Sequence, residues 1–440
     1  MIHPYSLSAM VLAACTCCSL ARAASVADPL PEPFPGTEEA KAYEVSDALE
    51  DLYMQGQIAE VARQGLDFIR TSPQPIDAEL RLKIALSLSA THQPAQAIEQ
   101  LQAVVDSGEM PAARQARLPL ANAHRWAGRP DLAQPHFEQI LKSEPSNADA
   151  QSGLTAVNRD LRPRTSIQWI GTDDNGGLRS QQAVLAHRWR SADLTQIYEV
   201  DAHLSRHEFT TTGPSAHARG ATVRYQRVDV PLEPKVSVSF DGAPLSGLLG
   251  ELRLKLSDSL SVSLARDNWG DVSLAPRALA QGMTANRLSA DGLLLTEWGV
   301  VSGRVAFNRV SDGNQVTTTT LKYTPALHLM NGVVKPYVFV DTREVDFAPP
   351  AYWSPAEGVG LYGLGTTLEW VHSDWYFILA GQYGQRWYGD AGKSWVGSAS
   401  VLRWVDDKTA VSANWFGLSS VRDRARYRSK SITLKVDRLW

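Results

Sequence analysis

The chain has 440 residues, of which 44% are hydrophobic and 20% charged, and its formal net charge is −4 at pH 7. This length allows two or three ordinary domains, and the composition is that of a folded chain without the bias of any special class. All three cysteines, Cys15, Cys17 and Cys18, lie near the N-terminus, which excludes a disulfide or a thiolate metal site in the rest of the chain.

The first residues have the pattern of a secretory signal. An apolar stretch from Leu7 to Leu20 ends at Ala21-Arg22-Ala23, which fits the small-x-small rule for cleavage. We therefore expect residues 1–23 to be a signal peptide. The alternative is lipoprotein processing at Leu12-Ala13-Ala14-Cys15, which would acylate Cys15. No later stretch approaches the roughly 18 to 20 apolar residues of a transmembrane helix, so any membrane span must be β.

A linker and a set of helical repeats come next. Residues 24–38 are rich in proline and predict an extended linker. Residues 39–160 have a helical pattern that repeats about every 35 residues, which predicts about three two-helix units. The third unit resembles the tetratricopeptide repeat (TPR), and the second aligns with it. The packing positions of these two units are Ala85, Ala97, Ala121, Gly128, Ala133, Phe137 and Pro145.

These repeats leave two interpretations open. In one, they form a helical array without a ligand. In the other, they offer a concave surface to a periplasmic protein partner.

From residue 161 to 440 the hydrophobic period falls to two, with about sixteen runs separated by turn residues, or fourteen if some are misassigned. From Tyr362 to Trp370 one face is apolar with an aromatic at each end, whereas the other is small and polar. Such alternation is typical of a transmembrane barrel with a wet lumen. We predict an α+β multidomain chain: an α-helical TPR-like solenoid followed by an antiparallel transmembrane β-barrel. The lumen-lining candidates are Thr367, Glu369, Gln382 and Arg386.

Connector lengths predict the orientation of the barrel, because outer-membrane barrels have short periplasmic turns and long outer loops. Short connectors, such as Asn331-Gly332, alternate here with long ones at 207–217, 267–285, 345–358 and 418–428. We expect the long ones outside the cell and the repeats in the periplasm. The last strand alternates and ends in an aromatic, the signal for the barrel-assembly machinery, at Ile432, Leu434, Val436 and Trp440.

Catalytic motifs are missing from the sequence, with no phosphate loop, nucleophile elbow or His-Glu-x-x-His, so we expect no enzyme, cofactor or metal site. We also expect no nucleic-acid partner. Basic residues from Arg422 to Lys430 predict contact with lipopolysaccharide in the outer-membrane lipid, or with an anionic polymer leaving the pore. Tyr352 and Trp353, in a long loop, are candidates for stacking against sugar rings, with loop packing as the alternative.

The order of signal peptide, TPR-like units, barrel and terminal aromatic resembles exopolysaccharide-export porins, such as those for poly-N-acetylglucosamine and cellulose. The Tyr352-Trp353-Ser354-Pro355 loop and the hairpin from Ser419 through Arg422 and Tyr427 to Trp440 are similar to that group. The resemblance implies a passive conduit for a polysaccharide polymer, with repeats that dock biosynthetic or scaffold partners. With only about three repeats, the chain departs from the long solenoids of the family, which puts those partners in doubt.

Two rival functions remain open. Surface lipoprotein assembly modulators also join TPR units to a barrel, and they move protein cargo. A non-transporting surface receptor or adhesin would carry its activity on the outer loops and have a plugged lumen.

Overall fold

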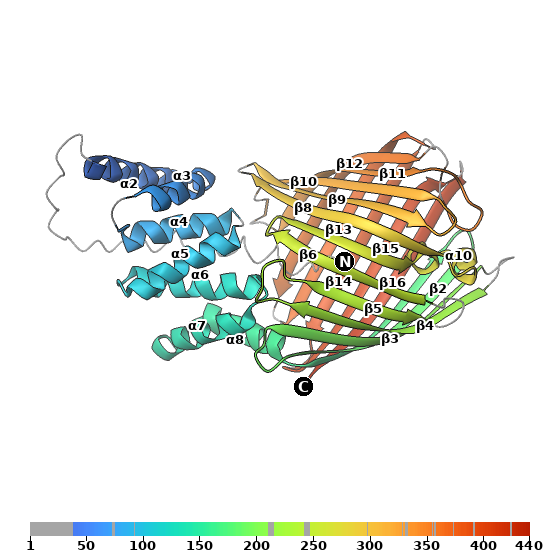
Figure 1. The fold of residues 1–440 in the computed structure, drawn as a ribbon, viewed down its shortest axis with the longest axis horizontal. Coiled ribbons are helices and arrows are strands. Elements are labelled where there is room, and N and C mark those ends of the chain that lie inside the picture. Colours follow the sequence, from blue (N-terminus) through green and yellow to red (C-terminus); the bar gives the residue numbers. More distant parts are fainter. Residues whose placement is uncertain are drawn as a thin grey trace. The chain divides into compact units, whose positions relative to one another are not determined.

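The computed structural model describes residues 38–440 apart from 73–74, 92, 210–214, 242–246, 297, 328, 331–332, 354, 356–357, 373, 390–391 and 423–424. The predicted signal peptide, Cys15 and nearly all of the linker lie outside these residues. The described part divides into a helical unit and a barrel unit, with the division between Asp160 and Leu161 (Figure 1).

The helical unit contains seven described helices, in which consecutive helices from the first to the sixth pack against each other and Phe137 of the sixth contacts Gly153 of the seventh. They are α2 (Glu38–Met54), α3 (Ile58–Thr71), α4 (Ala78–Ala90), α5 (Pro94–Ser107), α6 (Ala112–Trp126), α7 (Pro130–Ser143) and α8 (Ala148–Leu161). Local signals set their ends: the Asp77 carboxylate accepts hydrogen bonds from two amides at the start of α4, and proline occupies the first turn of α5 and α7. Within the described residues, no helix is long and apolar enough to cross a membrane.

Small residues let these helices approach closely. Ala85, Ala97, Ala121 and Ala133 are fully buried. Phe137 is fully buried as well, and its ring occupies the space that a side chain at residue 153 would need: a Cβ on Gly153 would lie 2.3 Å from Phe137 Cε1. Gly128 (φ +78°) lies in the turn between α6 and α7, and Pro145 follows α7 on the surface.

The barrel unit is a closed antiparallel barrel of sixteen strands, which confirms the predicted fold class and the larger strand count. The strands are β1 (Arg164–Asp174), β2 (Leu178–Arg190), β3 (Gln196–Phe209), β4 (Ser215–Arg227), β5 (Lys235–Asp241), β6 (Gly247–Ser257), β7 (Leu260–Asn268), β8 (Thr284–Thr296), β9 (Gly299–Val310), β10 (Gln315–Pro325), β11 (Val334–Val345), β12 (Val359–His372), β13 (Trp375–Tyr388), β14 (Lys393–Trp404), β15 (Thr409–Arg422) and β16 (Ala425–Leu439). Pairing of β1 with β16, from Arg164↔Leu439 to Asp174↔Ser429, closes the barrel and leaves no sheet edge exposed.

The barrel has two distinct ends. Connectors from odd to even strands lie at one end, here called the loop end, whereas β1 begins and β16 finishes at the other, here called the terminal end. Aromatic side chains of the apolar face mark both. Tyr362 and Trp387 lie 5.8 Å apart between ring centroids toward the loop end, and Trp370 and Phe377 lie 4.8 Å apart toward the terminal end. Two such girdles are typical of a membrane-spanning barrel.

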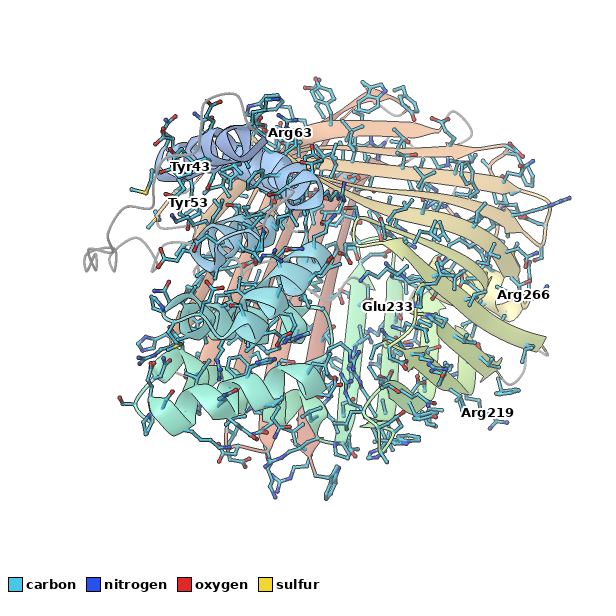
Figure 2. All side chains as sticks on the ribbon, turned by 60° about the vertical axis from the view of Figure 1, so that its left-hand side comes forward. Tyr43, Tyr53, Arg63, Arg219, Glu233 and Arg266 are labelled. Atoms are coloured by element: carbon cyan, nitrogen blue, oxygen red, sulfur yellow. The ribbon has the colours of Figure 1, made fainter. Side chains whose placement is uncertain are left out.

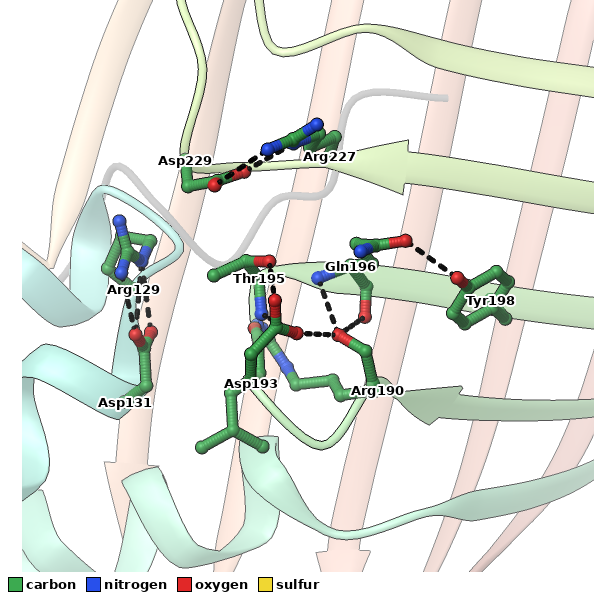
Figure 3. Close-up of polar contacts among 11 residues, drawn as sticks. Arg129, Asp131, Arg190, Asp193, Thr195, Gln196, Tyr198, Arg227 and Asp229 are labelled. Carbon is green, nitrogen blue, oxygen red and sulfur yellow. Dashed lines mark hydrogen bonds and ion pairs between the residues drawn. The ribbon is translucent and has the colours of Figure 1, made fainter.

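Side-chain hydrogen bonds order the turns. Between β2 and β3, Leu194 has a left-handed backbone (φ 61°), and its carbonyl accepts a hydrogen bond from Arg190 at 2.9 Å. The Asp193 carboxylate accepts hydrogen bonds from Ser191 and Thr195, and the bond from Ser191 contributes most to lowering the pKa of Asp193 (Figure 3). In such a turn, side-chain hydroxyl and carboxylate groups supply the hydrogen bonds that backbone pairing no longer supplies once the strands end.

Connector lengths confirm part of the expected alternation and correct the rest. The connectors 269–283 and 346–358 are long, and both lie at the loop end. The long connector expected at 418–428 is wrong, because β15 continues to Arg422 and β16 begins at Ala425; the alternating side chains there extend the hairpin. The short turn expected at Asn331-Gly332 lies outside the described residues; Leu329 and Val334, on either side of it, form an isolated bridge, and β10 itself finishes at Pro325. Pro325 has no amide hydrogen to extend the ladder.

Candidate functional site: the barrel lumen

The register divides the side chains of every strand between two faces. One face carries exposed apolar residues, among them Leu364 (67% exposed), Leu204 (62%) and Leu434 (49%). The opposite face carries most of the ion pairs of the barrel. Apolar side chains can face lipid whereas paired charges need a wet or protein surrounding, so the first face is outward and the second lines the lumen.

The predicted lumen candidates lie on this inward face. Thr367 is the register partner of both Lys335 and Ala380, and Glu369 binds Lys335 at 3.0 Å. Gln382 accepts a hydrogen bond from the Tyr337 hydroxyl at 3.2 Å. Toward the loop end, Arg386 donates to Ser420 Oγ at 2.9 Å. The four residues thus share one face but belong to separate contacts.

A wall from β3 to β12 holds networks of paired charges. Arg224 on β4 pairs with Glu199 at 2.8 Å and with the buried Asp201. His203 bridges two carboxylates, with Nδ1 3.3 Å from Asp201 and Nε2 3.1 Å from Asp241. His203 is therefore held between two carboxylates as part of an acid network.

Further along the same wall, Arg287 on β8 lies 3.2 Å from Asp267 and 3.5 Å from Glu251. The Asp291 carboxylate lies 3.6 Å from the guanidinium group of Arg253 and 3.8 Å from that of Arg304. Because each of these charges has a partner of opposite sign, the field that the networks project into the lumen is partly cancelled.

The opposite wall, from β13 to β16, carries few charges. Near mid-height its inward positions mix hydroxyl and amide side chains with apolar ones, among them Ile378, Ala380 and Val396. The hydroxyls and amides are Gln382, Ser398, Ser400, Ser412, Asn414, Ser431 and Thr433. Charged side chains of this wall lie nearer its ends, as with Arg386, Lys435 and Asp437. Among the hydroxyls lies Phe416, 41% exposed, with Ser398 and Ser431 as its register partners. An aromatic ring thus faces the lumen between hydroxyl groups.

A helical insert crosses part of the mouth at the loop end. It consists of α9 (Trp269–Val272) and α10 (Pro276–Ala280), in the connector from β7 to β8 (Figure 1). Leu279 is fully buried against Ala216 and Ala218 on the inward face of β4. Trp269, Ala278 and Met283 pack with Val310 and Val316 of β9 and β10. The insert therefore joins inward surfaces that are five to six strands apart.

Tyr352 belongs to the anchor of that insert. It is 5% exposed, its ring meets Trp269 edge-on at 5.6 Å, and its hydroxyl donates to Asp312 at 3.2 Å and accepts from Asn314 at 2.9 Å. Burial in this loop raises the pKa of Tyr352 to about 12. A buried ring offers no face to a sugar, so Tyr352 supports the loop-packing alternative. The neighbouring Trp353 is half-buried, and Arg343 lies 5.6 Å from its ring centroid.

The last hairpin places its residues on the outward face. Ile432, Leu434 and Val436 are 45%, 49% and 46% exposed, and Trp440 is 65% exposed at the terminal end. Arg426, Arg428 and Lys430 continue the same face toward the loop end, where Lys430 lies 3.5 Å from Asp173. Arg424 lies outside the described residues.

The helical insert, the acid network around His203 and the inward Phe416 were not singled out from the sequence. Trp269-Gly270 and Pro276 were available as a signal, because a tryptophan, a glycine and a helix-starting proline inside a long connector suggest a folded loop. The inward direction of Phe416 follows only from the register of β15, since Trp415 beside it is equally apolar.

Among solved structures, the chain is similar to a bacterial polysaccharide outer membrane secretin, with 13% identity and a TM-score of 0.52 over 64% of this chain and 99% of that chain. It is also similar to CdiB from Acinetobacter baumannii (10% identity, TM-score 0.38, 62% of this chain and 60% of that chain) and to OprB from Pseudomonas putida (9%, 0.36, 66% and 97%). No family model and no curated protein sequence matches the chain. At these identities the likeness concerns the fold, which is that of an outer-membrane β-barrel.

Proposed function

We propose that this chain is an outer-membrane conduit for a hydrated polymer, most simply an exopolysaccharide, with its loop end outside the cell and its helical unit in the periplasm. The helices would dock a periplasmic biosynthetic or scaffold protein. Transport would be passive, driven by synthesis at the inner membrane.

The observation that carries this proposal is the composition of the β13–β16 wall. Hydroxyl and amide groups exchange hydrogen bonds with sugar hydroxyls at little net gain or loss, so a chain of sugars can slide past them. Phe416 adds a flat apolar surface on which the C–H edges of a sugar ring can stack. The paired charges of the opposite wall avoid a strong field of one sign, which suits a weakly charged, hydrated cargo. The polysaccharide outer membrane secretin, whose fold is similar to that of this chain, suggests the same class of cargo.

The proposal is tested by secreted polysaccharide, measured by sugar analysis and dye binding, in a deletion strain of the host bacterium. We expect the intact gene to restore one polymer and Phe416→Ala to restore it poorly. Trp415→Ala serves as the matched control, because Trp415 is the neighbouring residue on the outward face. Polymer that is unchanged on deletion would argue against export.

A second candidate, a non-transporting surface receptor, is favoured by the insert across the mouth. A plugged barrel would show no ion conductance in planar bilayers, whereas a conduit conducts. Loss of surface-exposed lipoprotein in the deletion strain would instead support the protein-translocon alternative.

A further inference from the structure

A groove of about 560 Å³ lies on the outward face, mainly over β6 to β10, close to the loop end, and Val236 and Ser237 of β5 also line it. Its side chains form two tiers. The upper tier is cationic and polar, with Arg266, Asn286, Arg309 and Gln315. The lower tier is apolar, with Leu264, Leu288 and Phe307.

The strand register fixes this arrangement. Arg266 pairs with Asn286 and Arg309 pairs with Gln315. The Ser311 amide, just after β9, donates to the Thr284 carbonyl at the start of β8, so the upper tier forms a row across four strands. Leu264 pairs with Leu288, two residues further from the loop end, which separates the tiers by about 7 Å. Arg266 lies near the last residue of β7, Asn268, and Arg309 directly precedes the last residue of β9.

Charge and exposure distinguish this groove from the lumen. Leu264, Leu288 and Phe307 are 58%, 50% and 53% exposed, as expected for side chains that face hydrocarbon. Arg287 and Arg304, the inward arginines of β8 and β9, have acidic partners. Among the described residues, Arg266 and Arg309 form no ion pair within 4 Å, so the upper tier presents uncompensated positive charge.

A second outward groove, of about 540 Å³ over β1 to β4, repeats the combination. There Arg206, His217 and Arg219 lie beside Leu204 and Trp169, and Arg206 pairs with Glu208 at 2.6 Å. Figure 2 shows Arg219 and Arg266 on different strands near their loop ends. Two separate grooves thus place cationic side chains next to apolar ones at this end of the barrel.

We propose that the β6–β10 groove binds a phosphorylated glycolipid of the outer leaflet, of the lipopolysaccharide class. The guanidinium groups of Arg266 and Arg309 bind a phosphate through paired N–H donors. Asn286 and Gln315 contact the neighbouring sugar, and the acyl chains lie over the apolar tier. This inference rests on the proposed orientation, with the loop end in the outer leaflet, and not on the identity of the cargo.

The test is a titration of the purified full-length chain in detergent with bisphosphorylated lipid A, followed by native mass spectrometry. We expect the double variant R266Q/R309Q to bind at least about tenfold more weakly, because two charge-assisted contacts are lost. R403Q is the matched control: Arg403 also faces outward, beside Trp375, but lies toward the terminal end. Heat-modifiable migration in gels checks that each variant is folded.

Equal binding by the wild type and R266Q/R309Q would overturn the inference, and so would an equal loss in R403Q. Binding of dephosphorylated lipid A as tight as that of the bisphosphorylated form would overturn it too, as would inorganic phosphate binding as tightly as the lipid. Polymer secretion in the same variants is measured separately. If R266Q/R309Q secretes polymer normally but binds lipid weakly, the lipid site is supported and the export proposal stands. If the deletion strain secretes polymer normally, the export proposal fails, and the lipid site is still decided by the titration.

Discussion

His124 and His136 stack within the helical unit, with ring centroids 5.8 Å apart and an angle of 9° between the planes. His124 is 8% exposed. Burial lowers the pKa of both residues, and that of His124 falls to about 4; repulsion from His136 is the second cause for His124. A neutral pair is therefore built into the packing between α6 and α7, and its protonation opposes folding.

This pair predicts a pH dependence. The unfolded chain takes up a proton on His124 near pH 6.5, whereas the folded chain does so only near pH 4. Stability is therefore fully present above pH 6.5 and is lost as the pH falls toward 4, by at most roughly 3 kcal/mol. We expect the urea midpoint of the helical signal at 222 nm to be lower at pH 5 than at pH 7.5, and the difference to shrink in His124→Gln. Equal midpoints in the wild type would contradict this.

At the scale of elements, strand β16 shows how one residue step changes the environment of a side chain. Leu434 faces outward and is 49% exposed, whereas its neighbour Thr433 faces the lumen opposite Asn414. Arginine toward lipid costs roughly 2 to 4 kcal/mol near mid-membrane, but toward a wet lumen it costs little. We expect Leu434→Arg to reduce the amount of heat-modifiable, folded barrel in membranes and Thr433→Arg to leave it near the wild-type amount. The opposite order would show that the faces are exchanged.

The insert of α9 and α10 is an element whose position depends on few contacts. Gly270 allows it to fold tightly, because a Cβ there would lie 2.2 Å from the backbone nitrogen of Leu279. Leu279 anchors it on β4. We expect Leu279→Ser to release this contact and to raise single-channel conductance in planar bilayers, whereas Ala280→Ser, on the exposed neighbour, should not. Unchanged conductance in Leu279→Ser would mean that the insert does not limit the pore.

At the scale of the whole molecule, the two units have separate cores. The clusters around Leu82 and Ile84 contain residues of the helical unit alone, and the barrel is closed by its own β1–β16 pairing. We therefore expect residues 161–440, expressed behind the signal sequence, to give a folded, heat-modifiable barrel. The same fragment should not restore polymer secretion in the deletion strain, because the docking helices are missing. Full restoration would remove the proposed role of the helices.

The sequence determined the class of each element through its hydrophobic period. A period near 3.6 up to Leu161 and of two after it predicted helices and then strands, and the alternation along β12 and β13 assigned Thr367, Glu369, Gln382 and Arg386 to one face before any register was known. The polar residues that face inward and the leucines that face outward follow from the same period of two, because side chains alternate between the faces along each strand.

Only the tertiary structure decided which strands and loops meet. The His203 network joins β3 with β5, and the insert joins β4 with β9 and β10, through contacts between residues far apart in the sequence. Tyr352 was a candidate for sugar stacking as an exposed loop aromatic, and the packing of another loop on it buried its ring. Phe416 and Trp415 are both aromatic, and closure of the sixteen strands turned Phe416 toward the lumen and Trp415 toward lipid. Periodicity is a local property of the chain, whereas burial and facing depend on which distant segments the fold brings together.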